Sequence, residues 1–129
     1  MTFDGYSRMN RLLTKRYAEF RPFQDSFLSL ISNARTFGFY EDGVKLKEQG
    51  LAQGASLDNT IVINQDETIL NPEGLRSLDE FVRHKLLDFI GDMALAGVQI
   101  HGTLIGCNTS HSLNNQFLRA FMHAYDYWE

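Results

Sequence analysis

The chain has 129 residues and a mass of 14.8 kDa, which fits one compact domain and leaves little room for a second. Hydrophobic residues make up 43% of it, which is typical of a packed globular domain and excludes a largely disordered chain. Sixteen acidic against twelve basic residues give a net charge of -4, so the chain lacks the basic excess typical of nucleic-acid-binding proteins.

Cysteine content and hydropathy bear on the compartment. The single cysteine, Cys107, has no second cysteine with which to form an internal disulfide. No apolar run approaches the roughly 18 residues of a membrane span, and residues 1–16 lack the apolar segment of a secretion signal. We therefore expect a cytoplasmic protein without a membrane span or a nucleic-acid partner.

The beginning of the chain predicts little regular structure. Residues 1–15 show no hydrophobic period and predict a flexible lead-in, so the single domain is expected over 16–129. Polar and aromatic side chains alternate over 16–20, which predicts a strand. After Pro22, apolar residues recur at helical spacing as far as Ala34, which predicts a helix.

The middle of the chain predicts a small strand, helix and strand in succession. The aromatic segment 36–40 is expected to form the first strand. Asp42 is expected to cap a short helix that ends at Gly50. Residues 60–64 (TIVIN) predict the second strand.

The last third of the chain predicts two main helices. The first covers 77–96, with a capping box formed by Ser77 and Glu80. A strand over 98–105 and a helix from about Ser112 follow. Because strands and helices mix without strict alternation, we expect an α+β fold: a two-layer sandwich whose small sheet is covered on one face by the two main helices.

One stripe of the longest predicted helix carries ionisable groups. His84, Asp88 and Asp92 follow one another at intervals of four residues, so they share a ridge. Phe81 and Leu95 fall in the same sector, which predicts that the ridge faces a cleft or an interface. The core-facing stripe beside it comprises Leu78, Val82, Leu86, Phe89, Ile90 and Met93.

An imidazole and a carboxylate one turn apart, such as His84 and Asp88, can both reach one divalent cation. On this spacing alone, an ordinary surface ion pair worth a few tenths of a kcal/mol is the favoured alternative. A catalytic zinc site needs a third protein ligand, which the spacing of the other histidines does not indicate. His111 follows a polar loop at the start of the last helix, where it is either a site residue or a solvated loop histidine.

Four segments of the chain, taken together in their order and spacing, are a far more specific signal than any one of them alone. They are ARTFGF (34–39), GASLDNTIVI (54–63), LRSLDEFVRHKLLDFIGD (75–92) and SHSLNN (110–115). Together they resemble the zinc-dependent UDP-3-O-acyl-N-acetylglucosamine deacetylases (LpxC) of lipid A biosynthesis. The resemblance covers about residues 16–129 and corresponds to the second, C-terminal domain of that two-domain enzyme, so the first domain or its equivalent is an expected partner.

The resemblance implies a role for each matching residue. It favours the metal interpretation, with His84 and Asp88 as two of three zinc ligands and the third histidine in the first domain. His111 would be the general acid that protonates the leaving amine, with Asp92 as its carboxylate partner. Lys85 would bind the polar substrate and offset developing negative charge.

The resemblance also implies a substrate path. Thr36 would donate its hydroxyl to the oxyanion. The insertion 39–56 would form a hydrophobic passage for the acyl chain of the substrate. Residues expected at the substrate are Phe37, Phe39, Ser56 and Lys85, and possible wall residues are Leu46, Leu51 and Ala52, for which core packing is the alternative.

This chain departs from the family pattern at several positions. It contains no Glu-His pair, which in the family provides the general base and the third zinc ligand. Asn108 and Ser110 stand where a lysine and a glycine are usual, and Gly43 stands where an apolar side chain is usual.

These features together predict the C-terminal half of a zinc amidohydrolase that acts on UDP-3-O-acyl-N-acetylglucosamine and is inactive without the first domain. Two alternatives stay open. The first is a non-catalytic module that binds an acyl chain or a partner. The second is self-association through the interdomain face, with two copies supplying ligands to a shared ion.

Overall fold

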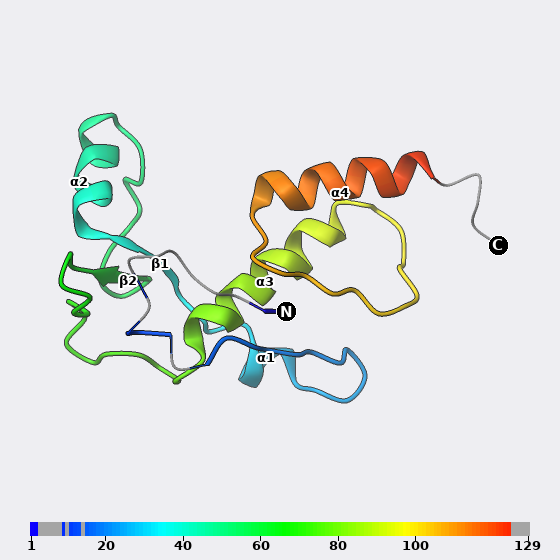
Figure 1. The fold of residues 1–129 in the computed structure, drawn as a ribbon, viewed down its shortest axis with the longest axis horizontal. Coiled ribbons are helices and arrows are strands. Elements are labelled where there is room, and N and C mark those ends of the chain that lie inside the picture. The colour runs from blue at the N-terminus through cyan, green and yellow to red at the C-terminus, as the bar shows by residue number, and fades with distance from the viewer. Residues whose placement is uncertain (3–8, 10, 14, 125–129) are drawn as a thin grey trace.

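The computed structural model describes residues 1–2, 9, 11–13 and 15–124. Their helices and strands follow one another in the order α1, β1, α2, β2, α3, α4 (Figure 1). The bounds are α1 Phe27–Leu30, β1 Thr36–Phe39, α2 Tyr40–Glu48, β2 Thr60–Ile63, α3 Glu80–Ala94 and α4 His111–His123. This mixture confirms the α+β class.

The two strands form a small parallel sheet. Thr36 of β1 lies opposite Thr60 of β2. Parallel neighbours need a crossover connection, and α2 supplies it, as the predicted strand, helix and strand imply (Figure 1). Ile61 and Ile63 of β2 are fully buried, so the sheet is fixed by the core on one face.

The boundaries of α2 correct one prediction and confirm another. Asp42 lies in the first turn and does not cap the helix, because β1 runs directly into α2 without a loop. The end near Gly50 is confirmed: this glycine has a φ of 76°, a conformation that side chains disfavour. The N–H of Leu51 then bonds back to the carbonyl of Leu46 and closes the helix.

Helix α3 begins three residues later than predicted, and the capping box is wrong. The carboxylate of Glu80 accepts hydrogen bonds from the backbone N–H and side chain of Arg35, and from the N–H of Arg76. Arg35 is buried, and a buried guanidinium needs an opposite charge close by, so Glu80 pairs with Arg35 rather than with Ser77.

The predicted core stripe of α3 is confirmed for Val82, Leu86, Phe89 and Met93, which are all buried. It is wrong for Leu78, which lies before the helix and is 64% exposed. The predicted position of Phe81 on a ridge facing a cleft or an interface is wrong. Its ring is only 1% exposed and packs edge-on against Phe37, with the ring centres 5.0 Å apart. Leu95, by contrast, is 70% exposed.

Two predicted strands and most of one predicted helix are not formed. Over 16–20, Tyr17 makes only an isolated bridge to Thr2, and 98–105 contains no strand. The helix expected after Pro22 shrinks to the four residues of α1, and Phe23 is almost fully exposed. Alternation of side chains is insufficient here, because a strand also needs a neighbour with which to pair.

The two main helices pack against each other. Helix α3 contacts β1, and α4 lies against α3 (Figure 1). The two-layer sandwich and the boundary between lead-in and domain therefore stay predictions. Of the lead-in, residues 3–8, 10 and 14 lie outside the described residues, while Met9 and Leu13 are buried. Within the described part of the chain, every helix falls short of the length and hydrophobicity that crossing a membrane requires.

Candidate active site

His84 and Asp88 of α3 face each other across one helical turn. Nε2 of His84 lies 3.4 Å from Oδ1 of Asp88. Nδ1 of His84 lies 3.1 Å from the carbonyl oxygen of Ala34, and because a carbonyl only accepts, Nδ1 must carry the proton. Nε2 is therefore the ring nitrogen directed toward Asp88, and in the neutral ring it carries the electron pair. A backbone carbonyl behind the ring is the usual arrangement for a histidine that binds a metal.

The two oxygens of Asp88 have different neighbours. Oδ2 accepts a hydrogen bond from Nζ of Lys85 at 3.0 Å, which leaves Oδ1 directed at His84. The side chains of His84 and Asp88 are each 15% exposed, so they lie at the edge of the core rather than on a solvated surface. This burial disfavours the ordinary surface pair, whose interaction water would weaken.

A second histidine and carboxylate pair bridges α3 and α4. Nδ1 of His111, the first residue of α4, lies 2.8 Å from Oδ2 of Asp92. The same oxygen accepts a hydrogen bond of 2.7 Å from the side-chain amide of Asn114, which is buried. Asp92 is thereby oriented, and it holds the His111 ring with Nε2 on the side away from Asp92. Ser110 caps α4 by accepting from the N–H of Leu113, which fixes the start of the helix, where the His111 side chain projects.

The two pairs meet at Asp88. Nε2 of His111 lies 3.9 Å from Oδ1 of Asp88, so both imidazoles direct Nε2 toward one carboxylate oxygen. An imidazole nitrogen and a carboxylate oxygen suit zinc chemically. Among the described residues, no three His, Cys, Asp or Glu side chains form a group that could hold a metal ion. An ion held by His84 and Asp88 would therefore need a further ligand from elsewhere.

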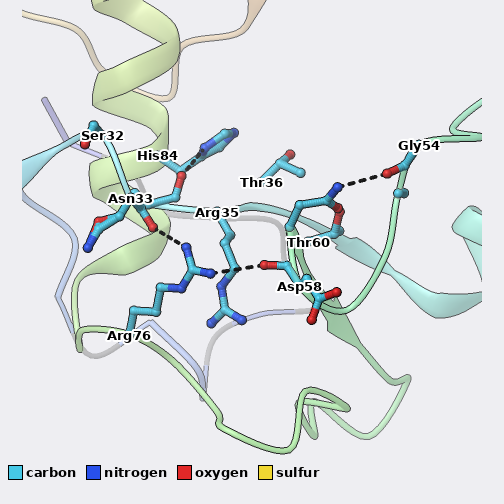
Figure 2. A pocket seen from close by; sticks show the side chains of 12 residues that line it. Ser32, Asn33, Arg35, Thr36, Gly54, Asp58, Thr60, Arg76 and His84 are labelled. Carbon is cyan, nitrogen blue, oxygen red and sulfur yellow. Dashed lines mark hydrogen bonds between the residues drawn. The ribbon is translucent and has the colours of Figure 1, made fainter. Parts of the chain in front are cut away.

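A polar cavity of about 550 Å³ opens beside His84. His84 and Thr36 both line it, as do Asp58 and Arg76 (Figure 2). The Arg76 guanidinium donates to the carbonyls of Asn33 and Asp58, and so joins the segment before β1 to the loop before β2 (Figure 2). These bonds hold the two walls of the cavity together.

An apolar cavity of about 740 Å³ lies between the sheet and α2, and shares Thr36, Ala55 and Thr60 with the polar cavity. Predicted substrate or wall residues that line it are Phe37, Phe39, Leu46, Ala52 and Ser56. Leu51 lies outside this lining, although it was expected as a wall residue. The two cavities thus lie next to each other, with Thr36 in the wall of both.

A buried ion pair supports the strand that carries Thr36. Nε of Arg35 lies 2.9 Å from Oε1 of Glu80, and the two side chains are 2% and 1% exposed. Burial acts to raise the pKa of the Glu80 carboxyl, but hydrogen bonds from Arg35 and from the N–H of Arg76 outweigh it, so this pKa lies below its ordinary value. The side-chain hydrogen bonds to Glu80 and, to a smaller extent, to Glu73 raise the pKa of Arg35. Both groups are therefore charged at neutral pH. Arg35 directly precedes Thr36 in the chain, and Glu80 lies one helical turn before His84.

The sequence did not indicate three of the supporting groups. The Ala34 carbonyl is a backbone group, so no side-chain pattern identifies it. Glu80 matched a capping box, and this concealed its contact with Arg35. Asn114 falls within the SHSLNN segment, three residues after His111, and this helical spacing was the one available signal.

A family model described as UDP-3-O-acyl N-acetylglycosamine deacetylase (LpxC) matches residues 3–123. Three similar proteins bear the name UDP-3-O-acyl-N-acetylglucosamine deacetylase. The protein from Nitratidesulfovibrio vulgaris is 57% identical over 89 residues, or 69% of this chain and 29% of the relative. The protein from Geotalea uraniireducens is 50% identical over 105 residues, and that from Pasteurella multocida 51% identical over 104 residues, each covering 81% of this chain and 34% of the relative.

The chain thus spans about a third of the length of the curated relatives it matches. The match nevertheless extends over nearly all of this chain and includes both helices that carry the polar groups described above. The chain belongs to the LpxC family of UDP-3-O-acyl-N-acetylglucosamine deacetylases.

Proposed function

We propose that this chain supplies one half of a zinc-dependent active site that hydrolyses the N-acetyl group of UDP-3-O-acyl-N-acetylglucosamine in lipid A biosynthesis. The observation that carries the proposal is the approach of His84 Nε2 and Asp88 Oδ1 to 3.4 Å, with Nδ1 held by the Ala34 carbonyl. In the hydrolysis, water adds to the acetyl carbon, the carbon–nitrogen bond breaks, and the leaving nitrogen accepts a proton.

His84 and Asp88 would hold the zinc ion through these two atoms. When bound, zinc supplies Lewis acidity toward the acetyl carbonyl and toward water. Lys85 donates to the other oxygen of Asp88, so it fixes the orientation of that carboxylate and adds positive charge close to the reacting carbonyl.

His111 would deliver the proton to the leaving nitrogen from Nε2. Its Nδ1–H bond to Asp92 leaves Nε2 as the reactive atom, from which a general acid would donate. Because Nε2 lies 3.9 Å from Asp88, the proton donor and the zinc ligands meet within one small volume.

Thr36 and the apolar cavity would position the substrate. Thr36 lines both cavities. A carbonyl bound beside His84 would therefore lie close to the Thr36 hydroxyl, while the acyl chain would extend toward α2. Phe37 packs against the His84 ring, with ring centres 6.0 Å apart, so it links the cavity wall to the zinc ligand. Phe39 and Ser56 line the path farther along.

The third zinc ligand and the general base would come from a first domain, because this chain has no Glu-His pair. The test compares three preparations: this chain, a first-domain polypeptide of the family, and their mixture. We expect hydrolysis of UDP-3-O-acyl-N-acetylglucosamine only in the mixture, and none when the chain carries His84→Ala. Substantial turnover by the chain alone would contradict the half-site proposal.

A non-catalytic acyl-binding module is the second candidate. The observation that favours it is that β1, α2, β2 and their loops line the apolar cavity without any contribution from α3. In that case the affinity for an acyl ligand would be indifferent to His84→Ala, and the mixture with a first domain would stay inactive. A loss of both zinc and acyl-ligand affinity in this variant would favour the enzyme.

A further inference from the structure

The peptide group between Ala34 and Arg35 is held at both ends by α3. Its carbonyl oxygen accepts from Nδ1 of His84 at 3.1 Å, and its N–H donates to Oε1 of Glu80 at 3.1 Å. Glu80 and His84 lie four residues apart on α3, so one peptide group spans a single turn of the helix. A continuous hydrogen-bonded chain therefore runs from the Glu80 carboxylate to the His84 imidazole.

The Glu80 carboxylate is fixed at the far end of this chain. It is 1% exposed and also accepts from Nε and Nη2 of Arg35, at 2.9 and 3.2 Å, and from the N–H of Arg76 at 2.6 Å. The Arg35 guanidinium is itself anchored by the Gly74 carbonyl and by Glu73. Water does not reach the pair, so its hydrogen bonds are electrostatically strong.

We propose that Glu80 is a positioning residue for His84, acting through the Ala34–Arg35 peptide. The inference rests on the proposed function, in which His84 Nε2 binds zinc. A negative charge at the N–H end polarises the peptide, which makes its carbonyl a stronger acceptor for Nδ1–H. That bond keeps the proton on Nδ1 and the electron pair on Nε2, the role that a carboxylate or carbonyl partner has for metal-binding histidines.

The position of Arg35 explains why a charged pair is used at this buried place. Its backbone N–H is the atom that Glu80 contacts, and its side chain neutralises the same carboxylate. The pair therefore fixes the peptide in register with α3 while balancing its own charge. An apolar pair of similar volume would fill the space without holding the peptide N–H.

The test measures the tautomer of His84 by nitrogen-15 NMR of the full chain at one fixed neutral pH, together with zinc affinity by calorimetry. Glu80→Gln keeps the side-chain shape and removes the charge. Because that change leaves the buried Arg35 guanidinium without the charge of Glu80, a second variant combines Arg35→Met with Glu80→Gln. Glu73→Gln is the matched control, since it removes a carboxylate from Arg35 without altering the peptide contact.

We expect the wild type and Glu73→Gln to hold the His84 proton on Nδ1. In Glu80→Gln and in the double variant, we expect a measurable population with the proton on Nε2 and zinc affinity 10–100-fold weaker. A wild-type ring protonated on Nε2 would overturn the inference, as would wild-type tautomer and zinc affinity in either folded Glu80 variant.

The same data separate this inference from the proposed function. Should no preparation bind zinc while the tautomer still shifts with Glu80, the positioning role stands and the zinc function fails. Should all preparations bind zinc equally with an unchanged tautomer, the zinc function stands and the positioning role fails.

Discussion

The polar site on α3 and the apolar cavity beside α2 are built in contrasting ways. Helix α3 buries six residues, and each of its site side chains has a defined hydrogen-bonding or ionic partner. Helix α2 buries none, and its apolar residues Val44 and Leu46 are each about 40% exposed. The site side chains of α3 thus have defined polar partners, whereas the residues of α2 that line the apolar cavity belong to a lightly packed helix.

This difference implies different consequences of substitution. Changes in the polar site leave a partner unsatisfied, so we expect large losses of rate or stability. Changes beside α2 alter the size of an open space, so we expect shifts in substrate preference with small effects on stability.

His111→Ala gives the largest expected effect. Removing a positioned general acid lowers the rate of hydrolysis by about 10²–10⁴-fold, measured as kcat of the chain mixed with a first domain. His123→Ala at the other end of α4 is the matched control, because that side chain is exposed and far along the helix. Equal rates for the two variants would show that His111 is not the acid.

Arg35→Met tests the buried network that supports the site. It leaves the Glu80 charge buried without its partner, so we expect the free energy of unfolding to fall by about 3–5 kcal/mol, measured by urea denaturation. Arg119→Met is the control, because Arg119 is exposed and bonds only to the side chain of Asn115 among its described contacts. A loss below about 1 kcal/mol would indicate that the pair contributes no more than a surface ion pair.

The same pair predicts how stability depends on pH. The folded-state pKa of Glu80 is lowered, so its contribution is fully present above the unfolded pKa of about 4.3. It is lost as the pH falls through the folded value, when the buried carboxylate becomes protonated. Urea denaturation at several pH values below about 5 should therefore show a shallower loss of stability for Glu80→Gln than for the wild type. Identical slopes would contradict this assignment.

Gly43→Leu tests the apolar cavity. Gly43 lines it, and a side chain there would meet open space rather than packed atoms. We expect the added side chain to fill part of the cavity and to shift preference toward shorter acyl chains by about 10-fold or more, since each methylene of fit is worth about 1–3 kcal/mol. The measurement is kcat/KM of the mixture for substrates of graded acyl length. An unchanged profile would show that the acyl chain lies elsewhere.

Gly43→Ala gives the smallest expected effect and serves as the control for the previous change. A glycine inside a helix costs about 1 kcal/mol relative to alanine, so the variant should be more stable by up to that amount in thermal unfolding. It adds one carbon to the cavity, so acyl-length preference should stay unchanged. A destabilised variant would mean that α2 needs the glycine conformation.

The parts of the fold that the sequence predicted are those with a strong local signal. The hydrophobic period of α3, the TIVI strand and the helix-ending Gly50 were all found at or near their expected positions. The strands predicted over 16–20 and 98–105 are not formed, because a strand depends on a neighbouring strand from elsewhere in the chain, and alternation does not reveal that neighbour.

The candidate site shows the same division. The spacing of His84, Asp88 and Asp92 placed three groups on one ridge, and the structure brings His111 to them. The groups that hydrogen-bond to these side chains, such as the Ala34 carbonyl and Asn114, come from other segments, and tertiary packing determines their positions. A single sequence identifies side chains by type and period, whereas their backbone partners depend on the folded chain.

The most direct measurement is a crystal structure of the chain with zinc, with anomalous diffraction recorded at the zinc absorption edge. The account predicts one peak about 2.0–2.2 Å from both His84 Nε2 and an Asp88 carboxylate oxygen, with Nδ1 of His84 still bonded to the Ala34 carbonyl. A zinc ion bound at other residues, with His84 and Asp88 paired only to each other, would contradict it.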